Sequence, residues 1–356
     1  MFRSLIAAAA ILLSSGGAAI AQTPFGTEPV ATFDRPWAVA PLPQGGFLVT
    51  EKAGRLVHVS ETGERRAIEG TPKVRDSGQV GLLDVALAPD FTSSRQLYLT
   101  WVDGADGGAL HLGRGRLDPD GVRLAGFNVI WRAAPTGGRG HPGAMIAFGP
   151  DGRLFLSSGD RQLGDPAQEP GDSRGKILRL TQDGAPAAGN PFPDAPEVWS
   201  LGHRNPYGLV FDPSGTLWSH EMGPRGGDEL NVIEPGANYG WPLVSEGRRY
   251  SGLPIPDHDT RPEFVPPVIE WSPVITPAGM IHYDGATFPE WRGSLLIGGL
   301  ASRALIRVEI ADGAAHEAER WDMGHRIRDV AAGADGAVYL LEDGQGARLL
   351  RLTRDD

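Results

Sequence analysis

Short apolar segments alternate with turns rich in proline, aspartate and glycine along most of the chain after residue 22. One unit consists of an apolar segment, a turn and a second apolar segment, which is the pattern of two antiparallel strands joined by a short loop. The turns lie near Pro43, Pro89, Pro150, Pro213, Asp284 and Ala334. The unit therefore occurs six times, at residues 37–50, 83–100, 144–157, 208–219, 279–297 and 330–340.

This repetition predicts an all-β fold, a six-bladed β-propeller of four-stranded antiparallel sheets. The first unit contains three of its four expected strands, at residues 38–42, 47–50 and 56–60. A pair of β-sandwiches is the alternative, but six copies favour a closed ring. No boundary divides residues 22–356, so we expect one domain. The proline-rich stretch 253–277 is predicted to be a long excursion between blades whose Phe264 and Trp271 become buried.

The N-terminus has the pattern of a secretory signal peptide. Arg3 precedes an apolar run over residues 5–13, and Ala19-Ile20-Ala21 forms a cleavage site of the A-x-A type. A membrane anchor is the alternative, but the apolar run is too short to cross a bilayer. We therefore expect cleavage of residues 1–21 before Gln22, no membrane span in the mature chain, and a periplasmic protein.

Composition narrows the chemistry. The formal net charge of −11 argues against nucleic acid as the main partner. The chain has no cysteine, which excludes disulfides, thiolate metal sites and a cysteine nucleophile. Lysine occurs only at Lys52, Lys73 and Lys176, so arginine supplies nearly all of the positive charge.

The third unit carries a histidine and an aspartate at adjoining strand ends. His141 precedes its first strand and Asp160 follows its second strand. Because these strands are antiparallel neighbours, the carboxylate can hold the imidazole in one tautomer and raise its basicity. Alternatively, His141 caps a turn and Asp160 fixes the corner at Gly159.

The fourth unit adds an arginine, an amide and a loop of free carbonyls. Arg204 and Asn205 precede its first strand, and an arginine fork suits bidentate binding of a carboxylate. The loop that includes Gly223 and Pro224 leaves main-chain oxygens outside any sheet, and calcium takes such oxygens. A solvated surface turn and an ordinary loop between blades are the alternatives.

The last unit begins with Arg326 and Arg328, which point to the same side if this segment is a strand. Two guanidinium groups on one side repel each other unless an anion lies between them, and a ligand with several carboxylates would provide one. A salt bridge to Asp329 or Asp322 is the alternative. Together, the four loops predict an anionic ligand, a hard cation and a general base at the mouth of a channel.

Five motifs are found in order at residues 78–84, 202–209, 221–229, 238–242 and 326–330. With these motifs the chain resembles, from about residue 36 to residue 352, the soluble quinoprotein glucose/sorbosone dehydrogenases, including periplasmic aldose sugar dehydrogenases. The resemblance implies a six-bladed propeller that binds pyrroloquinoline quinone (PQQ) and Ca²⁺. It also implies oxidation of aldose sugars at C1 to lactones, with electrons passed to an external acceptor, a quinone or a cytochrome.

The resemblance implies roles for the residues around the reacting atoms. His141 resembles the family's base, which also contacts the substrate, and Asp160 resembles the carboxylate that orients it. Arg204 and Asn205 resemble the groups over the reactive edge of the quinone, and Arg204 counts as catalytic. Gln79 matches a glutamine on the substrate side.

The resemblance also implies how the cofactors are held. The main-chain oxygens of Gly223 and Pro224 match the ligands of the catalytic Ca²⁺. Arg326 and Arg328 match the arginines that bind the carboxylates of PQQ.

Three positions depart from the pattern of the family. The segment 298–303 lacks the cofactor-side lysine of the glucose-oxidising members, and Arg303 is the candidate substitute. Gly140 replaces an acid next to the base, so a preference for glucose is not implied. The segment after Trp241 and Pro242 lacks the acid expected for a second calcium, so we expect one calcium.

Two other functions use the same scaffold. A calcium-dependent hydrolase of the sugar-lactonase kind would need Glu, Asn and Asp side chains as ligands at the channel. A non-catalytic binding module would keep the propeller and lose the redox chemistry.

Overall fold

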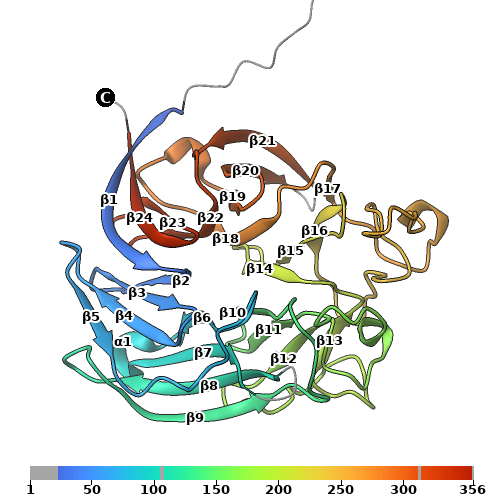
Figure 1. The fold of residues 1–356 in the computed structure, drawn as a ribbon, viewed down its shortest axis with the longest axis horizontal. Helices are drawn as coiled ribbons and strands as arrows, with labels where there is room; N and C mark the ends of the chain where they lie inside the picture. Colours follow the sequence, from blue (N-terminus) through green and yellow to red (C-terminus); the bar gives the residue numbers. More distant parts are fainter. Residues whose placement is uncertain (1–22, 105–107, 312–313, 355–356) are drawn as a thin grey trace, which may run out of the picture.

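The computed structural model describes residues 23–104, 108–311 and 314–354. In these residues, six antiparallel four-stranded sheets surround a central axis, as predicted (Figure 1). The strands β2, β6, β10, β14, β18 and β22 contact one another around this axis and form the inner ring. The expected signal peptide at residues 1–21 lies outside the described residues. Within them there is no helix that is long and apolar enough to cross a membrane.

Five sheets are each built from four consecutive strands. The first sheet contains β2 (Pro36–Pro41), β3 (Phe47–Glu51), β4 (Arg55–Val59) and β5 (Arg65–Ile68), and the second contains β6 (Leu82–Leu87), β7 (Gln96–Val102), β8 (Leu110–Leu117) and β9 (Leu124–Arg132). The third contains β10 (Gly143–Phe148), β11 (Leu154–Ser158), β12 (Lys176–Leu180) and β13 (Val198–Leu201). The fourth contains β14 (Pro206–Phe211), β15 (Leu217–Glu221), β16 (Asp228–Val232) and β17 (Ile269–Trp271), and the fifth contains β18 (Pro277–Tyr283), β19 (Ser294–Gly299), β20 (Ala304–Ala311) and β21 (Ala314–Asp322). The predicted strands of the first unit correspond to β2, β3 and β4.

The sixth sheet joins the two ends of the chain. It contains β22 (Ile327–Ala332), β23 (Val338–Glu342), β24 (Gln345–Arg354) and, as its outermost strand, β1 (Phe25–Asp34). The pairing runs from Phe25 opposite Arg354 to Asp34 opposite Gln345. The ring is therefore closed by hydrogen bonds between its first and last strands.

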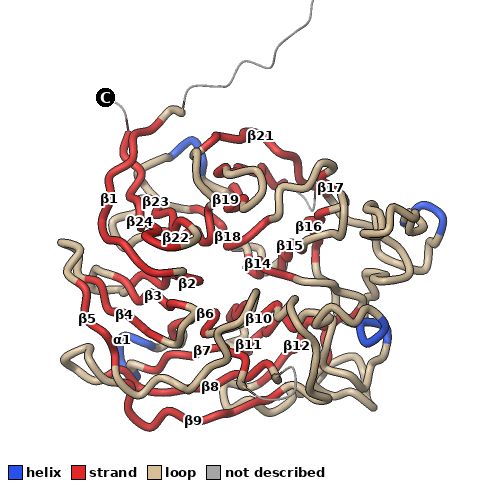
Figure 2. The backbone as a smooth tube through the Cα atoms, in the orientation of Figure 1, coloured by secondary structure: helices blue, strands red, loops and turns tan. Residues whose placement is uncertain are grey.

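Helical structure is confined to single turns between or within the sheets. The described helices are α1 (Phe91–Ser94) and the 3₁₀ turns η1 (Asp165–Gln168), η2 (His258–Thr260) and η3 (Pro289–Trp291). The long tan loops in Figure 2 gather beside the third and fourth sheets.

The proline-rich excursion connects two strands of the same sheet, which corrects the prediction that it lies between blades. Residues 233–268 connect β16 to β17, and Asp228 is paired with Trp271 in the same fourth sheet. Long-range pairing of β17 with β16 makes the excursion a loop within one blade. Phe264 and Trp271 are buried, as expected from their apolar character.

The apolar segments seen in the sequence are strands that are buried on both faces. All five residues of β3, β11 and β23 are buried. Each sheet packs between two neighbours, so a continuous apolar run suits the inner strands better than strict alternation. The largest apolar cluster joins the first three sheets and includes Leu48, Leu82 and Leu156.

Hydroxyl groups on second strands join neighbouring sheets. Thr50 Oγ1 accepts the N–H of Ala38 at 3.0 Å and donates to the carbonyl of Leu83 in the next sheet at 2.6 Å. Thr100 and Ser157 make the equivalent contacts to the carbonyls of Ala144 and Pro206 at 2.9 and 3.0 Å. These bonds satisfy buried main-chain groups that the sheet ladders leave unpaired.

The pairing of the first with the second strand is shifted in register in all six sheets. Such a bulge bends a strand and re-aims its side chains. His141 and the pair Arg204 and Asn205 lie directly before two of these shifts, Arg328 lies within a third, and Arg326 precedes that third shift. These five predicted site residues therefore sit at the irregular beginnings of inner strands, whereas Asp160, Gly223 and Pro224 follow second strands.

Two buried carboxylates connect neighbouring inner strands, β22 to β2 and β6 to β10. Asp329 accepts the N–H of Val39 at 2.8 Å, and Asp84 accepts the N–H of Ile146 at 2.7 Å. Burial raises the pKa of Asp329 to about 8 and the pKa of Asp84 to about 6. The negative charge of Asp84 also contributes to the shift of Asp329.

The raised pKa of Asp329 predicts that the folded protein loses stability as the pH rises. Between the ordinary pKa near 3.8 and about 8, the folded state binds a proton that the unfolded state has released, so the free energy of unfolding falls with pH. We expect Asp329→Asn to flatten this slope by up to about 1.4 kcal/mol per pH unit. Urea unfolding between pH 5 and 8 measures it, with the exposed Asp120→Asn as control. An unchanged slope in D329N would contradict the assignment.

Candidate active site

The structure places His141 and Asp160 side by side. His141 lies in the loop before β10, and Asp160 lies in the loop after β11. The imidazole Nδ1 is 2.7 Å from Asp160 Oδ1, and both residues are buried. This contact assigns the proton of the neutral ring to Nδ1 and leaves the lone pair of Nε2 for another group.

Asp160 is held by donors on both oxygens. The N–H of Gln162 donates to Oδ1 at 2.8 Å, and Trp241 Nε1 donates to Oδ2 at 2.8 Å. Burial by itself raises the pKa of Asp160, but the hydrogen bond and charge of His141 and these donors outweigh it and lower the pKa below its ordinary value. The carboxylate therefore stays ionised and fixed in orientation.

The main chain at His141 adopts an uncommon conformation that is held from two sides. Its φ is 44°, in the left-handed region. The side-chain oxygen of Gln79 accepts the N–H of His141 at 2.7 Å, and the N–H of Arg161 donates to its carbonyl at 3.3 Å. Gln79, expected on the substrate side, thus also anchors the loop of the expected base.

The ring of His141 is set up to be neutral. Burial lowers its pKa, and the hydrogen bond to Asp160 opposes this shift only in part. The positive charge of Arg204 lowers the pKa further. A neutral imidazole with a free Nε2 is the form that can accept a proton.

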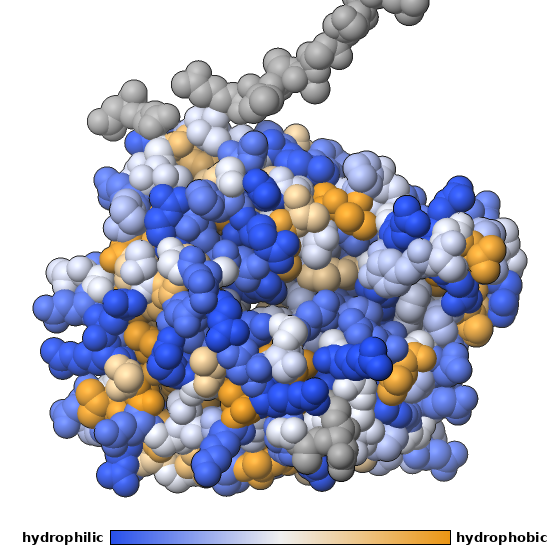
Figure 3. Space-filling model, viewed as in Figure 1, coloured by the Kyte–Doolittle hydropathy of each residue, from blue (hydrophilic) through white to orange (hydrophobic). Residues whose placement is uncertain are grey.

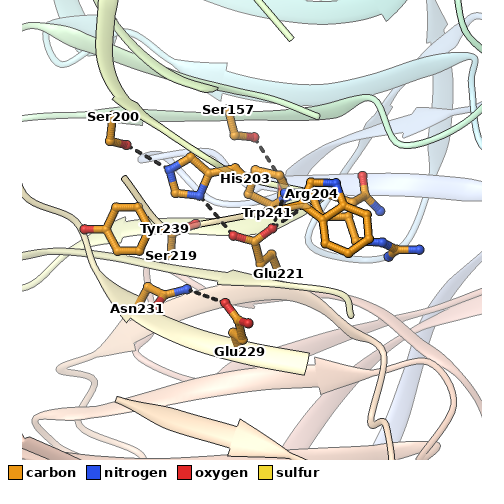
Figure 4. A network of polar contacts seen from close by, with 12 residues as sticks. Ser157, Ser200, His203, Arg204, Ser219, Glu221, Glu229, Asn231, Tyr239 and Trp241 are labelled. Carbon is orange, nitrogen blue, oxygen red and sulfur yellow. Dashed lines mark hydrogen bonds and ion pairs between the residues drawn. The ribbon is translucent and has the colours of Figure 1, made fainter. Parts of the chain in front are cut away.

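A buried carboxylate positions the loop of Arg204 and Asn205. Glu221 Oε2 accepts the main-chain N–H of Arg204, and that of Asn205 at 3.2 Å. Glu221 Oε1 lies 2.9 Å from His203 Nδ1, and His203 Nε2 lies 2.8 Å from Ser200 Oγ (Figure 4). Glu221 and His203 therefore hold this loop in place. The sequence analysis included both residues in motifs but predicted no role for either.

A second carboxylate lies below Glu221 in the same network (Figure 4). Burial, together with the negative charge of Glu221, raises the pKa of Glu229 well above its ordinary value. The amide of Asn231 donates to Glu229 at 3.3 Å. The cause is that a second negative charge next to Glu221 is unfavourable in this buried region.

The side chain of Arg204 lies between two aromatic rings. Its guanidinium carbon is 5.2 Å from the centre of Trp241 and 5.9 Å from that of Tyr250. Nη1 donates to the carbonyls of Met222 and Gly223 at 2.7 and 2.9 Å, and Nη2 bonds the Tyr250 hydroxyl at 3.0 Å. These carbonyls therefore converge on a point where positive charge is stabilised.

The donors in this loop suit a hard cation. Calcium binds main-chain and carboxylate oxygens, and the carbonyl of Gly223 already contacts a cationic group. A Cβ at Gly223 would lie 2.2 Å from the carbonyl oxygen of Gly227, so only glycine lets the chain approach so closely. Asp228 accepts the N–H of Gly223 at 2.8 Å. The described residues contain no group of three or more Asp, Glu or His side chains placed to hold a metal.

Arg326 and Arg328 share one carboxylate, which corrects the two partners considered from the sequence. Arg326 Nε is 2.7 Å from Asp343 Oδ2, and Arg328 Nε and Nη2 are 3.0 and 2.8 Å from Oδ1. Asp343 directly follows β23, the antiparallel neighbour of β22, and so faces both arginines. Asp329 instead accepts main-chain N–H groups, and Asp322 accepts the N–H of Gly324 at 2.8 Å.

A cavity of about 320 Å³ brings several predicted residues together. Gln79, Arg326 and Arg328 line it, together with Lys52, Tyr207 and Met222. Two of the lining residues also contact the other predicted residues: Gln79 accepts the main-chain N–H of His141, and the carbonyl of Met222 accepts a hydrogen bond from Arg204. Figure 3 shows hydrophilic side chains around the hollow centre of one face of the ring. A larger cavity of about 480 Å³, lined by Asp212 and His282, contains none of the predicted residues.

Arg303 does not join this group. Its side chain is exposed, and its main-chain carbonyl accepts the N–H of Met323 at 2.8 Å. The residues that line the cavity do not include it.

Comparisons with known proteins match most of the described ring. The model of the family described as glucose/sorbosone dehydrogenase matches residues 33–351. The chain is 38% identical over 336 residues to aldose sugar dehydrogenase YliI of Escherichia coli strain K12, covering 90% of each protein.

Solved structures give the same result. A crystal structure of a glucose dehydrogenase has a TM-score of 0.88 at 43% identity, covering 92% of this chain and 99% of that chain. The PQQ-bound aldose sugar dehydrogenase of Streptomyces coelicolor has a TM-score of 0.77 at 32% identity, covering 92% of this chain and 98% of that chain.

Glu221 is expected to be essential for the stability of the loop that carries Arg204. Replacement by alanine leaves the buried donors of His203, Arg204 and Asn205 without their acceptor, and we expect a loss of roughly 3–5 kcal/mol in the free energy of unfolding. Urea denaturation measures this loss, and the exposed Glu234→Ala provides the control. A loss below about 1 kcal/mol in E221A would contradict the assigned role.

Proposed function

The chain belongs to the glucose/sorbosone dehydrogenase family, and from this premise we propose that it is a PQQ-dependent aldose sugar dehydrogenase. It oxidises the sugar at C1 to a lactone and passes the electrons to an external acceptor, a quinone or a cytochrome. The observation that carries the proposal is the cavity lined by Arg326 and Arg328, which adjoins the buried pair of His141 and Asp160 through Gln79.

The cavity suits an anionic cofactor. Arg326 and Arg328 place two guanidinium groups on a single carboxylate of Asp343, so one positive charge of the pair is not balanced there. Trp37 packs under Arg328, 4.6 Å from its guanidinium carbon, and provides an apolar surface beside the charges. PQQ combines carboxylates with a flat ring system, and when bound it supplies the acceptor for a hydride.

His141 acts as the base. Its Nε2 accepts the proton of the C1 hydroxyl while the hydrogen on C1 departs with its electron pair, so that C1 becomes a carbonyl carbon. Asp160 keeps the ring in the required tautomer and stabilises the positive charge that develops on it. Trp241 and Gln162 hold Asp160 in place during this step.

Arg204 supplies positive charge next to the base. Its guanidinium is fixed between Trp241 and Tyr250, so it can stabilise negative charge that develops nearby without a large reorganisation. Asn205 is buried beside it, and its Oδ1 accepts the N–H of Gly143 at 3.3 Å.

The carbonyls of Gly223 and Pro224 would hold Ca²⁺, which would supply Lewis-acid chemistry to the bound quinone. Arg204 hydrogen-bonds the carbonyl of Gly223, so the guanidinium would lie next to such an ion.

The site of action proposed for this chain is the periplasm, after removal of residues 1–21. The aldose is the substrate, and the net charge of −11 argues against nucleic acid as the main partner.

Reconstitution of the purified apoprotein tests the proposal. PQQ and Ca²⁺ are added, and sugar-dependent reduction of a dye is followed together with the absorbance of the quinone. Dye reduction that requires PQQ, Ca²⁺ and an aldose supports the proposal. Lactone hydrolysis without PQQ would instead indicate a hydrolase, and failure to bind PQQ would indicate a binding module.

His141→Ala is expected to bind PQQ nearly as well as the wild type and to lower kcat by roughly 10²–10⁴-fold, because the proton acceptor is lost. Steady-state dye reduction measures kcat, and the exposed His316→Ala serves as the matched control. Turnover near the wild-type value in H141A would reject the assignment of the base.

The pH profile tests the pairing of His141 with Asp160. Since the pKa of His141 is lowered, the acid limb of kcat/KM should lie below the ordinary histidine pKa of about 6.5. The hydrogen bond to Asp160 raises this pKa, so Asp160→Asn should move the limb to still lower pH while reducing kcat. An acid limb that stays in place in D160N would contradict the pairing.

A further inference from the structure

Lys52 places a positive charge at the cavity of Arg326 and Arg328. It directly follows β3, is half-buried, and lines the cavity together with Gln79. Its ammonium group donates a hydrogen bond to the carbonyl of Gly78. No carboxylate of the described residues lies within salt-bridge distance of it. The charge of Lys52 therefore has only a neutral acceptor.

The other cations of this cavity are paired with acids. Arg35 binds Asp76 through two hydrogen bonds of 3.0 and 2.6 Å. Arg326 and Arg328 bind Asp343. In a chain with a net charge of −11, this cavity thus collects four cationic side chains, and three carboxylates, those of Asp34, Asp76 and Asp343, pair with three of them. Lys52 is the member of the group that has no ion-pair partner among the described residues, whereas each arginine contacts a carboxylate.

The geometry of Lys52 leaves it free to bind a ligand. An ammonium group has three donors, and the carbonyl of Gly78 uses one of them. Gly78 precedes Gln79, whose side chain holds the main chain of His141. Lys52 therefore lies on the wall of the cavity next to Gln79, the residue that anchors the main chain of the proposed base.

We propose that Lys52 is a binding residue for a carboxylate of the anionic cofactor, the position for which the sequence suggested Arg303. The inference rests on the proposed function, since it takes PQQ as the ligand. Arg303 does not line the cavity and its side chain is exposed, whereas Lys52 does line it. A carboxylate bound there would replace the missing ion-pair partner and strengthen a charge-assisted hydrogen bond.

Two substitutions separate the charge of Lys52 from its structural contact. Lys52→Met removes the charge and the donor, whereas Lys52→Gln removes the charge but retains an N–H donor for the carbonyl of Gly78. Lys52→Arg keeps the charge. Lys73→Met is the matched control, because Lys73 is an exposed lysine that does not line the cavity.

The measurement is the binding of PQQ to the calcium-loaded apoprotein, followed by quenching of tryptophan fluorescence at low and high salt. We expect K52M and K52Q to weaken binding by roughly 10- to 100-fold. The salt dependence of binding should also become smaller in both variants, while K52R and K73M stay close to the wild type. The trimethyl ester of PQQ, which lacks the carboxylates, should bind the wild type and K52Q equally.

The outcomes distinguish the two proposals. If the wild type does not bind PQQ, the proposed function fails. If the wild type binds PQQ and both K52M and K52Q bind it with the same affinity and the same salt dependence, the role of Lys52 is overturned. Thermal unfolding of each variant identifies any that does not fold. If either K52M or K52Q does not fold, the affinity of the other for PQQ tests the role of Lys52.

Discussion

The hydrogen-bonded pairing of β1 with β24 is the constraint on which the rest of the structure depends. A propeller blade cannot bury both of its faces alone, so each sheet needs a neighbour on either side. The sixth sheet obtains its outermost strand from the other end of the chain, from Phe25 to Asp34. Closure fixes the inner strands around one axis, and the loops that precede these strands then meet at one place.

The loops of the site are held by side chains rather than by sheet pairing. Main-chain N–H groups outside a ladder need acceptors when they are buried, and here Gln79, Asp160, Glu221 and Asp228 supply them. The same acceptors therefore determine where the functional groups point. These side chains position His141 and Arg204. Their role as acceptors explains why many polar residues are buried in this part of the ring.

Charge is distributed unevenly in the molecule. The chain is acidic overall, yet the cavity beside the inner ring gathers Arg35, Lys52, Arg326 and Arg328. Asp343 keeps the two neighbouring guanidinium groups together, and Trp37 gives Arg328 a flat surface to rest on. A protein that concentrates cations in a partly desolvated cavity is suited to an anionic ligand, because fixed charges interact more strongly where water is excluded.

The sequence by itself determined the repeated strands, because apolar segments and their turns depend on neighbouring residues. It identified six units, located β2, β3 and β4, and brought His141 and Asp160 to adjoining ends of paired strands. Only the tertiary structure decided the partners that come from distant segments: β1 beside β24, Asp343 beside the two arginines, Trp241 on Asp160, and Lys52 rather than Arg303 at the cavity. It also moved the proline-rich excursion into the fourth sheet. The pairing of β1 with β24 depends on how the ring closes, whereas Asp343 and the proline-rich excursion are placed by pairing within one sheet. In each case a local pattern of residues does not specify which segment or side chain becomes the partner.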